Sequence, residues 1–204
     1  MQFDHIAISG TDLEEAAAWV EDALGVRLQT GGAHDVFHTH NRVLGLADGL
    51  YLEAIAINPE APQPDRPRWF DLDRFSGPPR LTNWICRCED LDTELRRLPL
   101  GFGRPVDLQR DTLRWRMAVP DDGILPFDNC APALIEWQTP VHPAKRLVPS
   151  GIRLTRLTVR HPEAEKLKAL VAPALGDDRV AYETGSAGLH AAFETPRGPR
   201  ELEA

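Results

Sequence analysis

A segment that occurs three times along the chain constrains the fold more than any other feature of the sequence. DHIAISGTDLEEAAAWVEDALG (residues 4–25) aligns without a gap with TNWICRCEDLDTELRRLPLGFG at an offset of 78 (83 − 5). It also aligns with TRLTVRHPEAEKLKALVAPALG at an offset of 151 (176 − 25). Each copy predicts a strand followed by a helix, because alternating polar and apolar residues give way to an apolar stripe at helical spacing. A repeat of this size predicts a fold built from similar units packed together.

The segments after each copy complete the unit. In the first copy Thr11 or Asp12 can cap the helix and Gly25 can end it. Strand-like pieces follow at VRLQTG, THNRVLGLA and LYLEAIAI, so the unit is β-α-β-β-β. Three such pieces also follow the second copy, but only two follow the third.

We therefore predict an α+β fold of two β-α-β-β-β modules with a shorter third β-α-β-β module. The predicted boundaries are residues 1–58 for the first module, 59–80 for a linker, 81–140 for the second module and 141–204 for the truncated third module. The linker assignment rests on its many prolines and charged residues.

Composition excludes several classes of partner. The net charge of −8 with no basic run argues against nucleic acid, because that binding depends on Lys and Arg. We expect no membrane partner and a cytoplasmic location, because the chain has neither a spanning apolar stretch nor the pattern of a signal peptide. Three cysteines do not suggest a disulfide framework, so we expect free thiols.

The parity of strand positions selects a set of polar residues on one face. Side chains alternate across a strand, so in the first strand Ile6 and Ile8 are expected to face the helix and His5 the open side. Asn83 takes the place of His5 in the second copy. The four positions predicted to be equivalent and inward-facing are His5, Glu53, Asn83 and Glu136.

The paired modules, with His on the first strand and Glu on the fourth, resemble the vicinal oxygen chelate superfamily, which includes the glyoxalases. GGAHDVFHTHNRVLGLADGLYLEAIAINP, with LRWRMAVP, LPF and LIEW further on, is similar to the family of glyoxalase-like domain proteins. The resemblance covers nearly the whole chain. It implies a U-shaped sheet around a cavity, with one divalent metal ion (Zn²⁺, Ni²⁺, Mn²⁺ or Fe²⁺) held by inward-facing side chains.

Carried onto this sequence, the resemblance implies that His5, Glu53 and Glu136 are metal ligands and that Glu136 or Glu53 moves the proton. Asn83 departs from the pattern, because the superfamily usually offers His, Gln or Glu there and an amide oxygen is a weak ligand for transition metals. Two interpretations stay open: a metal site with three ligands, or a metal-free site whose polar groups bond to one another or to a ligand.

Six residues are candidates for substrate contact: Tyr51, Asn83, Arg87, His40, Asn41 and Arg116. An inward Arg87 suits an anionic substrate group, but a salt bridge to Glu53 or Glu136 would explain it equally well. His40 and Asn41 are neighbours on one strand and cannot both face the cavity. For Arg116 a solvent-exposed face is the commoner alternative.

The primary functional hypothesis is a metal-assisted lyase or isomerase acting on an oxygen-rich, anionic small molecule. The alternative is a metal-free protein that binds or sequesters a small molecule in the same cavity. The third module carries Arg156 at the His5 position and no ligand set, so we expect it either to cover a sheet edge or to form a homodimer interface.

Overall fold

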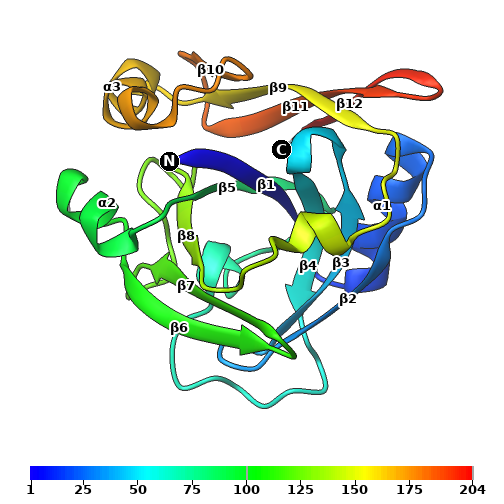
Figure 1. Cartoon of the computed structure of the whole chain (residues 1–204), viewed down its shortest axis with the longest axis horizontal. Coiled ribbons are helices and arrows are strands. Elements are labelled where there is room, and N and C mark those ends of the chain that lie inside the picture. The colour runs from blue at the N-terminus through cyan, green and yellow to red at the C-terminus, as the bar shows by residue number, and fades with distance from the viewer. Residues whose placement is uncertain (100, 204) are drawn as a thin grey trace.

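The computed structural model describes residues 1–99 and 101–203 and contains two β-sheets and three α-helices (Figure 1). The larger sheet has eight strands in the order β2-β3-β4-β1-β5-β8-β7-β6 and curls into a half-barrel. Its strands are β1 (Gln2–Ser9), β2 (Gln29–His34), β3 (Thr39–Gly45), β4 (Tyr51–Ile57), β5 (Arg80–Arg87), β6 (Arg104–Arg110), β7 (Leu113–Val119) and β8 (Ala133–Trp137).

The half-barrel consists of two modules joined at its centre. In the first module β1 pairs in parallel with β4, and in the second β5 pairs in parallel with β8. The antiparallel pair β1–β5 joins the modules into one continuous sheet. This arrangement confirms the predicted α+β class with paired β-α-β-β-β modules and a shorter third module. The module boundaries at residues 58, 80 and 140 stay a prediction.

The third module forms a sheet of its own in the order β10-β9-β11-β12. Its elements are β9 (Arg153–Arg160), α3 (Ala164–Leu175), β10 (Val180–Glu183), β11 (Gly188–Thr195) and β12 (Gly198–Glu203). β11 and β12 contact β5, and β12 contacts α1, so this sheet lies on the outer face of the central strands and not along an edge (Figure 1). The central strands are therefore covered on both faces.

The helices begin where the sequence predicts caps. The Asp12 side chain accepts a hydrogen bond from the Glu15 amide at the start of α1 (Leu13–Leu24), and Gly25 ends that helix in the left-handed conformation. Asp90 caps α2 (Leu91–Arg97) in the same way. α2 stops at Leu98 because the next residue is a proline, which disfavours helical geometry in the residue before it. No helix among the described residues is long and apolar enough to cross a membrane.

The described chain has three short 3₁₀ turns, of which the second and third contribute side chains to the inner face of the half-barrel. They are η1 (Ala47–Gly49), η2 (Trp69–Asp71) and η3 (Pro143–Arg146). η2 lies in the predicted linker and brings Trp69 into the concave side of the sheet. η3 belongs to residues 138–152, which connect the second module to the third and are called the strap here. The strap crosses the open side of the half-barrel (Figure 1).

Trp84 on β5 is among the largest fully buried side chains of the protein. Its ring is fully buried, meets Phe3 edge-to-face at 6.0 Å, and its Nε1 donates to the Cys130 carbonyl at 2.8 Å. We expect Trp84→Ala to lower the free energy of unfolding by about 3–5 kcal/mol, because it leaves a large cavity. Urea denaturation followed by circular dichroism measures this. Val148→Ala, at a side chain 68% exposed, is the control and should change stability by less than about 0.5 kcal/mol.

Candidate functional site

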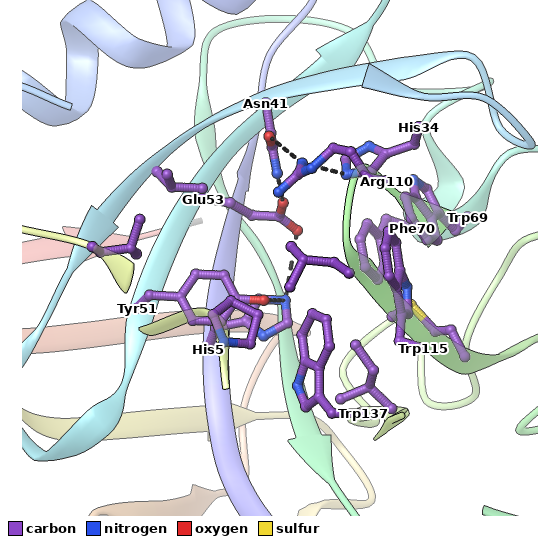
Figure 2. Close-up of a pocket in the computed structure, with 16 residues that line it drawn as sticks. His5, His34, Asn41, Tyr51, Glu53, Trp69, Phe70, Arg110, Trp115 and Trp137 are labelled. Carbon is purple, nitrogen blue, oxygen red and sulfur yellow. Dashed lines mark hydrogen bonds and ion pairs between the residues drawn. The ribbon is translucent and has the colours of Figure 1, made fainter. Parts of the chain in front are cut away.

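The concave side of the half-barrel encloses a cavity of about 60 Å³. This is room for roughly four to six water molecules. Both modules and the strap contribute to its wall, and Figure 2 shows the side chains that point into it. The polar residues on the wall come mainly from the first module, and the aromatic residues mainly from the linker and the second module. The site is therefore asymmetric although the fold is repeated.

His5 occupies the centre of the polar side and is held from both directions. Its Nδ1 lies 2.6 Å from Asp4 Oδ1, and its Nε2 lies 3.6 Å from Glu53 Oε1 and 3.3 Å from the Tyr51 hydroxyl. The Tyr51 ring stacks on the imidazole at 4.2 Å between centroids. Asp4, His5 and Glu53 are each at most 5% exposed, so this row of ionisable groups is sealed from bulk water.

A bulge in β1 explains how neighbouring residues reach each other. In a regular strand the side chains of residues 4 and 5 would point to opposite faces. The pairing of β1 with β5 shifts register between Phe3 and His5, and bulges of this kind re-aim side chains. Asp4 therefore lies beside His5, where strand parity alone would have placed it in the packed outer face.

The buried groups change one another's protonation. Burial opposes charge on His5, but the hydrogen bonds to Asp4 and Glu53 outweigh it and raise the pKa of His5 from 6.5 to about 9. Burial alone would raise the pKa values of Asp4 and Glu53. Interactions with His5, and with His142 for Asp4, outweigh burial and lower both pKa values. At neutral pH the row is thus an imidazolium between two carboxylates. Burial raises the pKa of Tyr51 well above 10, so its hydroxyl stays neutral.

Asn41 and Arg110 extend the polar side beyond Glu53. Asn41 Nδ2 donates to Glu53 Oε2 at 2.6 Å, and Asn41 Oδ1 accepts from Arg110 Nη1 at 3.2 Å (Figure 2). Arg110 Nη1 also lies 3.5 Å from His34 Nε2. Burial lowers the pKa of His34 to about 4, so this imidazole is neutral at pH 7. The result is a continuous path of contacts from Asp4 to Arg110.

Aromatic side chains and the strap close the rest of the cavity. The main aromatic wall comprises Trp69, Phe70, Trp115 and Trp137. Pro143 and Leu147 of the strap complete the lining. His142 ties the strap to the site, because its Nε2 lies 2.7 Å from Asp4 Oδ2. Ligand atoms in the cavity would contact mostly apolar surface, with the polar groups gathered on one side.

Glu136 does not face this cavity, so its predicted placement was wrong. Ile135 and Trp137 on β8 point inward, and Glu136 points to α2, where Oε2 accepts from the Leu91 amide at 2.8 Å and lies 3.4 Å from Arg116 Nη1. The pairing registers show why.

Glu53 pairs with Ala7, whose equivalent at the offset of 78 is Ile85. Ile85 pairs with Ala133. Ala133, and not Glu136, therefore occupies the position of Glu53 in the second module.

The other predicted residues divide between the cavity and elsewhere. Tyr51 and Asn41 line it together with His5 and Glu53. Asn83 is fully buried, and neither end of its amide has a hydrogen-bond partner within residues 1–99 and 101–203. It lies beneath the lining and does not form part of it.

The remaining three predicted contacts point away from the cavity. His40 lies beside Glu14 and Glu60 in a surface groove, because its neighbour Asn41 takes the inward position. Arg116 is on the outer face, where Nη2 donates to Asp92 at 2.9 Å. Arg87 donates to Gln2 and lies 3.5 Å from Asp4 Oδ2, so it supports the charged row from behind instead of pairing with Glu53 or Glu136.

The side chains do not fit a metal centre. Within the described parts of the chain, no group of three or more His, Cys, Asp or Glu side chains is placed to hold a metal ion. The predicted set of His5, Glu53 and Glu136 cannot assemble, because Glu136 is on the other face of the sheet. His5 and Glu53 are also already engaged with Asp4 and Asn41.

The comparisons with known proteins agree with this fold. A family model described as a glyoxalase-like domain matches residues 3–175. The chain belongs to this family. The predicted membership of the vicinal oxygen chelate superfamily is thereby confirmed. Among curated proteins, none matches the chain significantly.

Three solved structures are similar to the chain at low sequence identity. A hypothetical protein from Staphylococcus aureus is 14% identical with a TM-score of 0.62, over 91% of this chain and 87% of that one. A Mn(II)-bound glyoxalase from Novosphingobium aromaticivorans is 9% identical, with a TM-score of 0.49, over 98% of this chain and 81% of that one. Methylmalonyl-CoA epimerase from Mycobacterium tuberculosis is 23% identical, with a TM-score of 0.44, over 68% of this chain and 88% of that one. The first likeness supports the fold, and the other two, with TM-scores under 0.5, support no conclusion about the fold or the site.

Sequence reasoning missed Asp4, His34 and Arg110 as members of the site. The adjacent Asp and His at positions 4 and 5 were visible, but only the bulge brings them together. Arg110 is the last residue of β6 in the second module, and nothing in its local pattern shows that it reaches the first. The glycine pair at positions 31 and 32 was the available signal, because it marks a close approach to the β2 backbone.

We expect the pKa values of the buried His5 and His34 to differ from 6.5 in opposite directions. A raised pKa means that His5 stabilises the fold fully below about pH 6.5, and that this stabilisation is lost as pH rises through 9. A lowered pKa means that His34 stabilises the fold fully above about pH 6.5, and that this stabilisation is lost as pH falls through 4. Imidazole NMR titration of wild type and His5→Gln measures both. A His5 resonance that titrates near 6.5 would contradict the charged row.

Proposed function

We propose that the protein is a small-molecule enzyme of the lyase or isomerase type that moves a proton without a metal ion. One observation carries the proposal: His5 Nε2 and Glu53 Oε1 lie 3.6 Å apart and face the same enclosed cavity. A carboxylate and an imidazolium of opposite charge at one substrate site provide a base and an acid together.

The two groups divide the chemistry. Ionised Glu53 accepts a proton from a carbon next to a carbonyl, and the electron pair of that C–H bond moves onto the carbonyl oxygen. His5 Nε2–H donates a hydrogen bond to the oxygen as its negative charge develops. Return of the proton to another carbon or to the other face gives an isomer or epimer. Asp4 supports His5 in this role because its bond to Nδ1 fixes the ring with Nε2 toward the cavity.

The surroundings favour proton transfer between Glu53 and a bound molecule. The aromatic wall and the strap exclude bulk water from the row of charges. Low polarity strengthens the interaction of His5 with a developing oxyanion. Asn41 holds the second oxygen of Glu53, which leaves Oε1 as the atom that faces His5 and the substrate.

We expect wild-type protein to catalyse exchange of carbon-bound hydrogen with deuterium from the solvent in a panel of small oxo and hydroxy compounds. Proton NMR follows the loss of signal. Glu53→Gln removes the base and should lower the exchange rate by about 10²-fold or more. Glu136→Gln is the matched control, because Glu136 bonds to α2 on the far face, and it should leave the rate unchanged. Loss of exchange in Glu136→Gln with retention in Glu53→Gln would overturn the assignment.

We also expect activity and stability to be independent of divalent metal. Adding Ni²⁺, Zn²⁺, Mn²⁺ or Fe²⁺ should not raise the melting temperature, and protein purified without chelators or affinity metals should contain no stoichiometric metal. The reason is that no group of three or more His, Cys, Asp or Glu side chains among the described residues is placed to hold a metal ion, and His5 and Glu53 are already engaged with Asp4 and Asn41. Mass spectrometric detection of one metal per chain, lost in His5→Ala, would contradict this expectation.

A metal-free binding protein is the second candidate. It is favoured by the mutual satisfaction of the polar groups: Asp4 with His5, Asn41 with Glu53, and His34 with Thr39 at 2.9 Å. A site of this kind can hold a ligand without changing it. Ligands that bind the cavity but show no hydrogen exchange in wild type would support this function.

A further inference from the structure

We propose that Arg110 is an anion-binding residue of this cavity and that the ligand is a short-chain carboxylic acid. The inference rests on the proposed function, because it names the substrate class for the same site. Three observations carry it. The guanidinium reaches across from the other module, it has no carboxylate partner in the described part of the chain, and a pair of glycines leaves space for it.

Arg110 crosses from one half of the barrel to the other. It ends β6 in the second module, and its side chain contacts Asn41 on β3 and His34 on β2 (Figure 2). β2 and β6 are the two end strands of the sheet, and their residues contact one another. The guanidinium therefore stands at the cavity wall where the ends of the half-barrel meet.

The contacts of Arg110 leave its charge uncompensated. Within residues 1–99 and 101–203 it forms no salt bridge, whereas Arg116 on the next strand has three carboxylates within 4 Å. The partners of Arg110 are the Asn41 amide oxygen and a neutral imidazole, and both engage Nη1. A guanidinium has five N–H donors in a planar fork that matches a carboxylate. Among the described residues, neither of its other nitrogens, Nε and Nη2, has a hydrogen-bond partner.

Gly31 and Gly32 on β2 create the space for this arrangement. A Cβ at Gly32 would lie 2.6 Å from Arg110 Cδ, and one at Gly31 would lie 2.1 Å from Asn41 Oδ1. The Gly32 amide itself donates to Asn41 Oδ1 at 2.9 Å. Neither glycine has the positive φ that would require the residue for backbone reasons. Glycine is therefore required at both positions because Arg110 and Asn41 occupy the space that a side chain would fill.

The position of Arg110 limits the ligand to a small acid. One side chain, that of Asn41, separates the guanidinium from Glu53. A carboxylate bound by Arg110 therefore places its neighbouring carbons beside the His5–Glu53 pair. The cavity of about 60 Å³ leaves little space beyond that. The class that fits is a short-chain carboxylate with a carbonyl or hydroxyl next to the acid group.

The test compares a carboxylate with its neutral analogue. Propionate and propionamide have nearly the same shape, and saturation-transfer NMR measures the affinity of each. Arg110→Met keeps the length of the side chain and removes its charge, and we expect it to weaken propionate binding by at least about tenfold while leaving propionamide unchanged. Arg114→Met is the matched control on the same hairpin, because Arg114 bonds to Gln109 at the surface, and it should bind as wild type does.

Gly32→Ala provides a second route to the same result. The new methyl group displaces Arg110 without removing it, so this variant should also lose propionate affinity, even where Arg110→Met is too unstable to study. Equal affinity of propionate and propionamide in wild type, or wild-type propionate binding in Arg110→Met, would overturn the proposal; where Arg110→Met does not fold, wild-type propionate binding in Gly32→Ala would do so.

Glu53→Gln separates this inference from the proposed function. Removal of a negative charge near the carboxylate should leave propionate binding intact or tighter, although hydrogen exchange is lost. If no compound shows exchange in wild type but propionate still binds through Arg110, the proposed chemistry fails and the anion subsite stands. If exchange occurs but Arg110→Met leaves propionate affinity unchanged, the subsite fails and the proposed chemistry stands.

Discussion

The antiparallel pairing of β1 with β5 is the interaction on which the rest of the structure depends. It joins two modules that would otherwise be separate sheets, and it brings the last residue of β6 within reach of β2 and β3. It also contains the bulge that turns Asp4 toward His5. The third module covers the outer side of this pair, so the strand that carries His5 is buried on both faces.

Burial of this strand carries a desolvation penalty for its charged groups, and neighbouring groups compensate for each charge. A buried charge is tolerated only when it is paired and hydrogen-bonded. His5 lies between Asp4 and Glu53, and Asp4 has additional partners in His142, Trp137 and Arg87. Such a network stabilises little relative to apolar packing, but it holds the ring of His5 in one orientation. That fixed orientation is what a site for proton transfer requires.

The repeat and its helix caps were enough to predict the α+β modules, because both are local features with a fixed spacing, whereas the U-shaped sheet was implied by the family resemblance. Strand parity likewise indicated the side of the sheet on which the structure brings His5 and Glu53 together, since β1 and β4 are adjacent and pair in simple register. Parity failed for Glu136 because the loop between β7 and β8 conceals where β8 begins, and a shift of one residue reverses every side chain. Arg110 was beyond sequence reasoning because its position depends on how far the sheet curls, which no single strand encodes.

The curl of the sheet has a mechanical consequence. Neighbouring strands elsewhere in the half-barrel are held by ladders of backbone hydrogen bonds, but β2 and β6 stand at opposite ends of the strand order. In the described part of the chain, Arg110 on β6 contacts His34 on β2 across these two ends, and it also bonds to Asn41 on the next strand, β3. Separating β2 from β6 breaks no ladder of backbone hydrogen bonds, so it requires less work than separating any two paired strands of the half-barrel. The half-barrel thus opens most easily between β2 and β6, and this line passes the Arg110 guanidinium at the cavity wall.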